Sequence, residues 1–350
     1  MTMNQYDVFV GSYGKATEES IHWLRFNAAD GKLSKVASIS GVENPSFVTL
    51  NHTQNRLYSV SEVENGKIVS FDIDYVTGKL TELNRQSTKG SSPCFVEVHE
   101  SDQYIFTANY GGENITVHPL GLSGHIDPVS EIKVHSNRGA EVNATSHPHC
   151  IRNVPNTNVY TVADLGLNRL FLYEFNEASS ELVLINEVEV PVNSGPRHIS
   201  FHPHLHRLYI VNELNSTILV YSYDGKVENL KWLQTIDTIP WNYEGSNYCA
   251  DIHVSPSGSY LYASNRGHHS ITAYKILEDG KLDCLEQTST LGEWPRNFAI
   301  VPDERYILVA NEHTNSIVVM QIRENGSLQE TEQIYSVSKP VCLQILRRKE

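Results

Sequence analysis

A sevenfold internal repeat is the feature that most limits what this chain can fold into. Each copy opens with a short segment led by proline, and a run of β-branched and aromatic residues follows about ten residues later. A third alternating segment and, in most copies, a glycine-led fourth complete the unit. Dividing 350 residues among seven copies leaves 50 for each, a period typical of repeat architectures. The β-rich runs are residues 8–10, 57–60, 105–108, 159–162, 208–211, 261–264 and 307–310.

The repeat predicts an all-β fold. Four short segments with period-two alternation and turn residues between them are typical of a four-stranded antiparallel sheet. Seven such blades predict a β-propeller, whose radial arrangement limits exposed sheet edges. The N-terminal copy lacks its proline-led strand, whereas residues 339–346 supply that strand and nothing else. We therefore expect the C-terminal strand to pair with the N-terminal strands, and residues 1–350 to form one domain.

Composition narrows the partners and the compartment. The chain has 27 Lys and Arg against 41 Asp and Glu, a formal charge of -14, which argues against nucleic acid or an anionic membrane as a partner. No signal-like segment opens the chain and no apolar stretch approaches ~18 residues, so we expect a cytoplasmic protein. Five widely spaced cysteines without a CxxC motif fit a reducing compartment. We expect no cofactor and no metal, and a monomer or weak homodimer.

Polar residues collect at one end of the predicted hairpins. The start of the first strand of a copy lies opposite the end of the second, because the two form a hairpin. Arg197 and Glu213 are 16 residues apart, as are Arg296 and Glu312, whereas the other hairpin ends carry ordinary turn residues. This asymmetry predicts a ligand site at one mouth of the ring. The equivalent pairs are Cys94 with Tyr110, His149 with Asp164 and Ala250 with Arg266, and neighbouring positions add His147, His198 and Asp251.

Three arginines at that mouth favour a small anionic ligand. Arg197, Arg266 and Arg296 stand at corresponding positions of different copies. A guanidinium group binds phosphate or carboxylate through two parallel hydrogen bonds, so an acidic protein that gathers three of them is suited to an anion. Structural ion pairs with Glu213, Asp164 or Glu312, which would tie neighbouring blades together, are the alternative.

Other chemistries find less support. His147 and His149 would share a strand face and could bind a metal, but no third ligand stands at a characteristic spacing. Cys94 stands at the corresponding hairpin end, but no sequence motif of a nucleophilic cysteine surrounds it. The absence of GxSxG, P-loop and GxGxxG motifs argues against the common serine hydrolases and nucleotide-binding proteins.

The motifs at the predicted mouth are distinctive. Among them are Ser146-His-Pro-His149, Gly195-Pro-Arg-His198 and Ser264-Asn-Arg-Gly-His268. Together they resemble the seven-bladed propeller lactonase family, also called the cycloisomerase 2 family, and the resemblance covers essentially the whole chain. That family contains the bacterial propeller-type 6-phosphogluconolactonases, to which the resemblance is closer, and the fungal carboxy-cis,cis-muconate lactonizing enzymes. Further matching segments are residues 108–112, 164–166, 212–214 and 295–298.

The resemblance implies a site without metal or cofactor that uses one histidine, one glutamate and two arginines. The matching motifs assign these roles to His149, Arg197, Glu213 and Arg266. We expect a lactonase that hydrolyses 6-phospho-D-glucono-1,5-lactone, an intermediate of the pentose phosphate pathway. The residues expected to contact substrate are His147, His198, Arg296, Tyr110, Asp164 and Asp251.

The chemistry leaves several roles open. His149 suits general acid-base work near neutral pH, and His147 of the same motif competes with it for this role. Glu213 could instead be the base or could orient the histidine or a water. One arginine would stabilise the developing oxyanion and another would hold the substrate phosphate, helped by Arg296 or His198. A one-residue shift in strand parity would exchange Arg197 for His198 at the mouth. The alternatives are a carboxy-cis,cis-muconate cyclase and a propeller that only binds partners.

Overall fold

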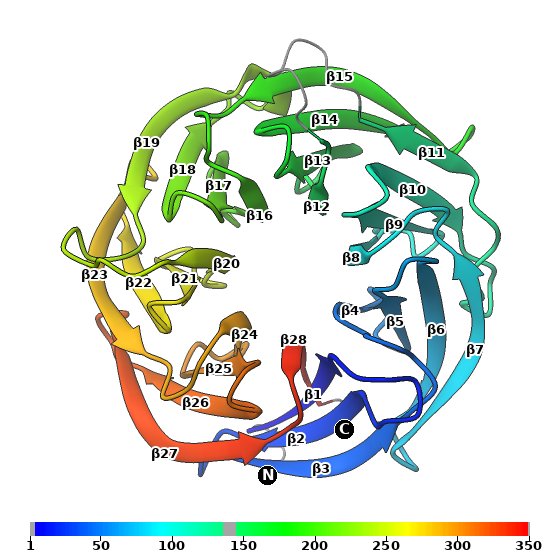
Figure 1. Ribbon diagram of the computed structural model, residues 1–350, viewed down its shortest axis with the longest axis horizontal. Coiled ribbons are helices and arrows are strands. Elements are labelled where there is room, and N and C mark those ends of the chain that lie inside the picture. Colours follow the sequence, from blue (N-terminus) through cyan, green and yellow to red (C-terminus); the bar gives the residue numbers. More distant parts are fainter. Residues whose placement is uncertain (1–3, 136–144, 349–350) are drawn as a thin grey trace. The chain divides into compact units, whose positions relative to one another are not determined.

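The computed structural model describes residues 4–135 and 145–348, and within them the strands form seven four-stranded antiparallel sheets (Figure 1). The predicted seven-bladed β-propeller is confirmed. Backbone contacts divide the described chain into two compact units. The first unit comprises Tyr13–Ile21 and Ala37–Pro196, and the second comprises the stretch up to Ser12, His22–Val36 and the stretch from Arg197 onward.

Three sheets lie in the first unit, and neighbouring strands in each sheet are consecutive in the sequence. Their strands are β4 (Val48–Leu50), β5 (Arg56–Ser61), β6 (Lys67–Asp74) and β7 (Lys79–Ser87); β8 (Pro93–Val98), β9 (Tyr104–Asn109), β10 (Asn114–Pro119) and β11 (Glu131–Val134); and β12 (Pro148–Asn153), β13 (Val159–Asp164), β14 (Arg169–Asn176) and β15 (Glu181–Glu189).

The next three sheets follow the same order and belong to the second unit, apart from Pro196 at their start. Their strands are β16 (Pro196–Phe201), β17 (Arg207–Asn212), β18 (Thr217–Ser222) and β19 (Lys231–Asp237); β20 (Tyr248–Val254), β21 (Tyr260–Arg266), β22 (Ser270–Ile276) and β23 (Leu282–Ser289); and β24 (Pro295–Ile300), β25 (Tyr306–Asn311), β26 (Ser316–Ile322) and β27 (Leu328–Ser336).

The seventh sheet joins the two ends of the chain. Its order is β28 (Pro340–Arg347), β1 (Gln5–Ser12), β2 (Ile21–Asn27) and β3 (Lys32–Ile39). β28 and β1 run antiparallel, with Val8 opposite Ile345 and Val10 opposite Leu343, and they lie side by side in Figure 1. The predicted pairing of the C-terminal strand with the N-terminal strand is therefore confirmed. That the whole chain is one domain stays a prediction.

Burial within a sheet explains the sequence pattern of its strands. β13 is buried along its whole length and β25 is buried from Ile307 onward, so both faces of these second strands select apolar and small residues. The fourth strands β15 and β27 each have one buried residue and are otherwise exposed or half-buried, as expected of strands that face solvent. Helix in the described residues is confined to the single turn η1 (Val227–Asn229), and none of it could cross a membrane.

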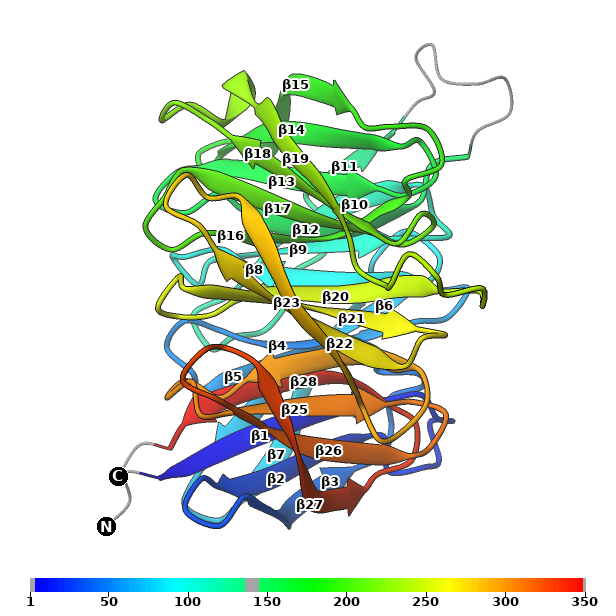
Figure 2. The ribbon, with the colours of Figure 1, turned by 90° about the vertical axis from the view of Figure 1, so that its left-hand side faces the viewer.

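Each sheet is twisted. In Figure 2 the first strand β20 runs almost horizontally, whereas the fourth strand of the same sheet, β23, crosses the view steeply. Adjacent strands rotate relative to one another because of the right-handed twist of the L-amino-acid backbone. The candidate site residues lie at the ends of the first two strands of a sheet, which are neighbours and so differ little in direction.

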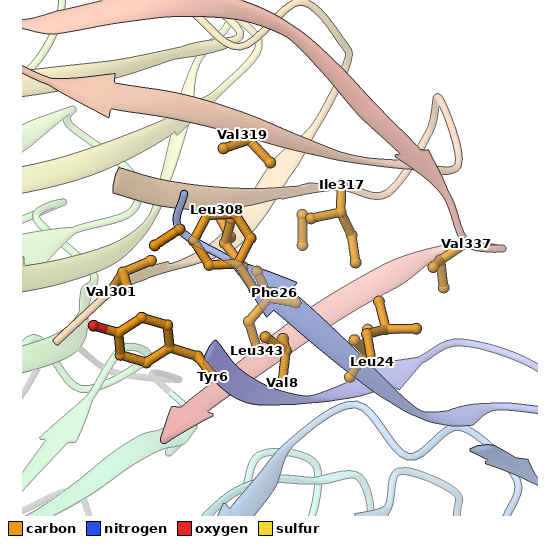
Figure 3. Close-up of a cluster of buried hydrophobic side chains, with 13 residues drawn as sticks. Tyr6, Val8, Leu24, Phe26, Val301, Leu308, Ile317, Val319, Val337 and Leu343 are labelled. Carbon is orange, nitrogen blue, oxygen red and sulfur yellow. The ribbon is translucent and has the colours of Figure 1, made fainter. Parts of the chain in front are cut away.

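Apolar side chains hold neighbouring sheets face to face. Figure 3 shows one such cluster, in which Phe26 of the seventh sheet packs among residues of β25 and β26. The ring of Phe26 meets that of Tyr306 edge-on, with centroids 5.4 Å apart. Burying one side chain of this size contributes about 1.5–3 kcal/mol, so several together anchor one blade on the next. The buried members are Tyr6, Val8, Val10, Leu24, Phe26, Ala28, Val301, Leu308, Ala310, Ile317, Val319, Val337 and Leu343.

A β-bulge near the start of the first strand corrects the expected alignment of the hairpins. Pro148, not His149, lies opposite Asp164, and Cys150 lies opposite Ala163. His149 is thus an extra residue without an opposite partner. Such a residue bends the strand and re-aims its side chain, so equal sequence spacing misplaces the partner by one position. The same irregularity makes Cys94 and Arg296 extra residues in β8 and β24, and it sets Tyr248 rather than Ala250 opposite Arg266.

Candidate active site

A buried carboxylate between two buried guanidinium groups forms the centre of the site in the second unit. Glu213 Oε2 lies 2.9 Å from Arg197 Nε and 2.7 Å from Arg266 Nη2. Only 2% of Arg197 and 4% of Arg266 is exposed to solvent. Arg197 stands at the start of β16, Glu213 directly follows β17, and Arg266 ends β21. These three residues are called the arginine cluster below.

The cluster confirms one predicted contact and replaces another. Arg197 and Glu213 meet, as their spacing predicts. Arg266 pairs with the same glutamate, whereas the sequence offered an acidic residue of a different copy as one possible partner. The structural reading of both arginines as ion-pair members is therefore correct. It does not exclude a ligand, because each guanidinium group has five N–H donors.

Backbone carbonyl groups of β20 fix the orientation of both arginines. Arg197 donates a short hydrogen bond from Nη1 to the carbonyl oxygen of Ala250. Arg266 donates from Nε to Tyr248 O at 3.2 Å and from Nη2 to Cys249 O at 3.0 Å. Among residues 4–135 and 145–348, Nη1 of Arg266 has no hydrogen-bond partner. An oriented, charged donor thus remains for a ligand oxygen.

The electrostatics of the cluster weaken Glu213 as a base. Burial raises the pKa of its carboxyl group, but the charges of Arg266, Arg197 and Arg296 lower the pKa by more than burial raises it. The pKa of Glu213 therefore lies below its ordinary value. Burial and the charge of Arg197 lower the pKa of Arg266 to about 10, which leaves it charged at neutral pH. Of the three bases that the sequence left open, the glutamate is the least suited, because an efficient general base has a pKa near the working pH.

Positive charge predominates around the cluster. Arg296, half-buried in β24, is close enough for its charge to act on both Glu213 and Arg266. The guanidinium groups of Arg197, Arg266 and Arg296 thus act together on the carboxylate of Glu213, in a chain whose formal charge is -14. Where water is partly excluded, such an excess favours an anion or an oxygen on which negative charge develops.

His198 is held as a neutral imidazole next to the cluster. Its Nδ1 lies 2.8 Å from Asp251 Oδ1 and its Nε2 lies 3.3 Å from Arg197 Nη1. Burial first, and then the charge of Arg197, lower its pKa to about 4 despite the attraction of Asp251. The ring is therefore uncharged at neutral pH. In the tautomer that fits these contacts, Nδ1–H donates to Asp251 and Nε2 accepts from Arg197.

Asp251 serves as an anchor for its neighbours. Its Oδ2 accepts from His253 Nε2 at 2.8 Å and from the side-chain amide of Asn297, while Oδ1 also accepts from the backbone N–H of Ile252 at 3.0 Å. Burial raises its pKa, but the two histidines lower it far more, so the carboxylate stays charged. Because protein groups occupy both oxygens, the geometry favours a positioning role over the substrate contact that the sequence suggested.

A second polar cluster lies in the first unit and is built mainly from rings. His149 Nδ1 lies 3.7 Å from Cys94 Sγ, and both residues are buried. The rings of Tyr110 and His147 stack at 4.4 Å, and the ring of His149 meets Tyr110 edge-on at 5.6 Å. These four residues are called the histidine cluster below. The structure thus groups three predicted site residues with Cys94.

His147 and His149 have different surroundings in this cluster. His147 Nδ1 lies 2.9 Å from the carbonyl oxygen of Tyr110, and its backbone N–H donates to Asp164 Oδ1 at 2.9 Å. His149 is the extra residue of the bulge in β12, and its Nδ1 faces a thiol. The backbone contacts tie His147 into the structure. His149 therefore remains the better candidate for proton transfer.

Asp164 is the predicted substrate contact that the geometry supports least. It is completely buried and accepts hydrogen bonds from Ser146 Oγ at 2.6 Å and from the backbone N–H of Leu167 at 3.0 Å. His135 Nδ1 lies 2.7 Å from Oδ2, a partner that sequence spacing missed because it lies outside the repeated hairpin. Burial raises the pKa of Asp164, and these partners bring it below its ordinary value. The residue braces the loop that carries His147.

Comparison with known proteins agrees with this description of a seven-bladed propeller. The family model for "Lactonase, 7-bladed beta-propeller" matches residues 7–345. The 6-phosphogluconolactonase of Bacillus subtilis is 31% identical over 351 residues, which cover 99% of this chain and 100% of the relative. The 6-phosphogluconolactonase of Formosa agariphila is 31% identical over 315 residues, 87% of this chain and 88% of that protein.

A solved structure extends the comparison to the backbone. The periplasmic gluconolactonase of Pseudomonas aeruginosa superimposes with a TM-score of 0.92 at 26% identity, covering 98% of this chain and 99% of that one. The chain therefore belongs to the lactonase family of seven-bladed β-propellers. It is a lactonase, a hydrolase that opens cyclic esters.

Proposed function

We propose that this lactonase hydrolyses a sugar lactone, and that its substrate is 6-phospho-D-glucono-1,5-lactone. The observation that carries the proposal is the arginine cluster, in which Arg266 keeps an oriented N–H donor and Arg296 adds a further positive charge. A lactone carbonyl needs one such donor, and a phosphate needs another cation. The names of the Bacillus and Formosa relatives point to the same substrate.

The reaction requires few groups. The oxygen of a water attacks the lactone carbonyl carbon, and negative charge develops on the carbonyl oxygen, where Arg266 stabilises it. The bond between that carbon and the ring oxygen then breaks, and the ring oxygen takes up a proton as the carboxylate forms. A general base must take up the proton of that water, a role for which the sequence predicts His149, and such catalysis contributes about 10²–10⁴-fold.

In this proposal Arg296 binds the phosphate of the substrate. It is the least buried of the three arginines, and its charge acts on the cluster from the neighbouring strand β24. Both ring nitrogens of neutral His198 face protein groups, Asp251 and Arg197, so in this proposal His198 orients Arg197 and does not contact the phosphate. A cytoplasmic location, a monomeric or weakly dimeric state and a role in the pentose phosphate pathway belong to the same proposal. The five widely spaced cysteines, which form no CxxC motif, fit a reducing compartment.

Substrate comparison tests the proposal. Freshly prepared 6-phosphoglucono-1,5-lactone and glucono-1,5-lactone are supplied to the protein and to Arg296→Ala, and acid release is followed with a pH indicator. We expect turnover of both lactones, and an at least tenfold selective loss of kcat/KM for the phosphorylated one in Arg296→Ala, as fits a lost charge-assisted contact. Arg305→Ala, which removes an exposed arginine paired with Asp303, should leave both rates unchanged.

Several results would contradict the proposal. Hydrolysis no faster than the spontaneous reaction for either lactone would remove sugar lactones as substrates, and turnover of 3-carboxymuconate instead would favour the cycloisomerase activity. Equal losses for both lactones in Arg296→Ala would show that this residue does not bind the phosphate. Full activity after neutralising the arginine cluster would show that the active site lies elsewhere.

A further inference from the structure

Trp294, directly before β24, occupies a backbone position that does not suit it. Its φ is 64°, in the left-handed region where side chains are disfavoured. The residue before the repeat proline is left-handed in other copies as well, where Asn44, Ser92 and Gly195 have φ of 47°, 50° and 61°. Asparagine and glycine tolerate this conformation best. A bulky indole is therefore present at a position whose backbone conformation disfavours it, and this points to a function for the ring.

The ring lies against the arginine cluster. The guanidinium carbon of Arg266 is 5.4 Å from the centre of the Trp294 ring, within the range of a cation–π contact. The ring of His313 stacks on Trp294 at 4.7 Å and 10°, and that of Tyr248 lies 6.2 Å away. The indole is only half-buried, and Tyr248 is 39% exposed. An aromatic surface thus adjoins the charged donors.

We propose that Trp294 is a substrate-binding residue that packs against the C–H face of the sugar ring. This inference rests on the proposed function, because it assigns the apolar side of the same site. A carbonyl oxygen bound to Arg266 lies about 2.9 Å from the donor nitrogen. Because the guanidinium carbon is 5.4 Å from the indole centre, a six-membered ring attached to that carbonyl can reach the part of the indole that Arg266 and His313 leave uncovered. Ligand sites commonly combine aromatic walls with a few oriented polar groups.

The same geometry would let the site distinguish a ligand that carries a sugar ring from a simple anion. The arginines of the site can bind any small anion, inorganic phosphate included. An aromatic wall beside them adds contact area only for a ligand that carries a ring. Trp294 would therefore select cyclic sugar derivatives over free phosphate, in addition to steadying Arg266 through the cation–π contact.

Binding measurements with two probes separate these roles. Glucose 6-phosphate offers a closed, unreactive sugar ring with a phosphate, and inorganic phosphate offers the charge alone. Trp294→Asn places at position 294 the residue that position 44 uses in the same backbone conformation, so the fold should persist. By calorimetric titration we expect it to weaken glucose 6-phosphate binding roughly tenfold or more, with the Kd for phosphate changed less than twofold.

Two further variants serve as controls. Trp294→Phe keeps an aromatic ring and should stay within about threefold of the original Kd for glucose 6-phosphate. Trp241→Asn removes a tryptophan that is 94% exposed and should change neither Kd. Circular dichroism of each variant checks that the sheets are retained.

The possible outcomes decide between the inference and the function on which it rests. Unchanged glucose 6-phosphate affinity in Trp294→Asn, equal weakening of both probes, or no binding of glucose 6-phosphate to the unaltered protein would overturn the role of Trp294. Absence of sugar-lactone turnover in the unaltered protein would overturn the proposed function instead. A selective loss of ring binding supports the inference whichever way that assay turns out.

Discussion

The arginine cluster of the second unit is held together by charge, whereas the histidine cluster of the first unit is held together by ring contacts. In the former, Glu213 lies within 2.9 Å of two guanidinium groups. In the latter, Tyr110 stacks on His147 at 4.4 Å and meets His149 edge-on. A charged cluster fixes groups that stabilise a transition-state charge, and a neutral one leaves an imidazole able to gain and lose a proton.

This difference between the two clusters determines which residues can be replaced without loss of stability. Removing one member of a buried ion pair leaves an uncompensated charge, which is strongly destabilising. Removing a ring from a stacked group loses contact area only. We therefore expect substitutions in the histidine cluster to affect activity more than stability, and substitutions in the arginine cluster to affect both.

The largest expected effect is that of His149→Ala on turnover. Loss of a general acid-base group lowers kcat by about 10²–10⁴-fold. His147→Ala is the matched control, because the same motif contains both histidines and His147 is tied to the backbone of Tyr110. Full activity in His149→Ala together with loss in His147→Ala would exchange the two roles.

Glu213→Gln should give the next largest effect, on stability. It leaves Arg197 and Arg266 as buried like charges, and we expect the free energy of unfolding to fall by about 2–4 kcal/mol in urea titrations. Glu82→Gln is the control, because Glu82 pairs with Arg85 in the other unit at 2.5 Å but both side chains are more than a third exposed. Exposed pairs of this kind contribute about 0–1 kcal/mol. Similar losses in both variants would refute the distinction between buried and exposed pairs in this chain.

The repeat made most of the fold predictable from the sequence. Blade number, strand order and the pairing of β28 with β1 follow from counting proline-led segments, because each strand type recurs with its own burial pattern. The contact between Arg197 and Glu213 was predictable for the same reason, since a hairpin of fixed length brings its two ends together.

The finer features of the site were not predictable. No particular residue type marks the bulge that makes His149 and Arg296 extra residues. Sequence spacing therefore gave each of them an opposite partner on the second strand, whereas the preceding proline is the residue that is paired. The anchors of Asp251 come from its own strand and from β24, a different sheet, and no periodicity connects them. The role of Trp294 depends on its backbone angle and on a cation–π contact, neither of which a sequence displays.

The smallest expected effect concerns His198 and tests how the arginine cluster tolerates acid. The pKa of His198 is about 4 in the folded protein because of burial and the charge of Arg197, whereas the ordinary value is 6.5. Between these values the unfolded chain binds a proton that the folded one does not, so stability falls as the pH is lowered from about 6.5 toward 4. Asp251, whose pKa is also lowered, adds a loss of the same sign at still lower pH.

His198→Asn removes the titrating group while keeping a side chain that can donate to Asp251. The unaltered protein should lose roughly 1–3 kcal/mol of unfolding free energy between pH 7 and 4.5 through this residue, and the variant should show a correspondingly flatter profile in urea titrations at each pH. His204→Asn, at an exposed turn, should keep the original slope. Identical slopes in all three proteins would mean that His198 is protonated in the folded state as readily as in the unfolded chain. The balance between burial, Arg197 and Asp251 would then favour the charged ring, and His198 would add to the positive charge available for an anionic substrate.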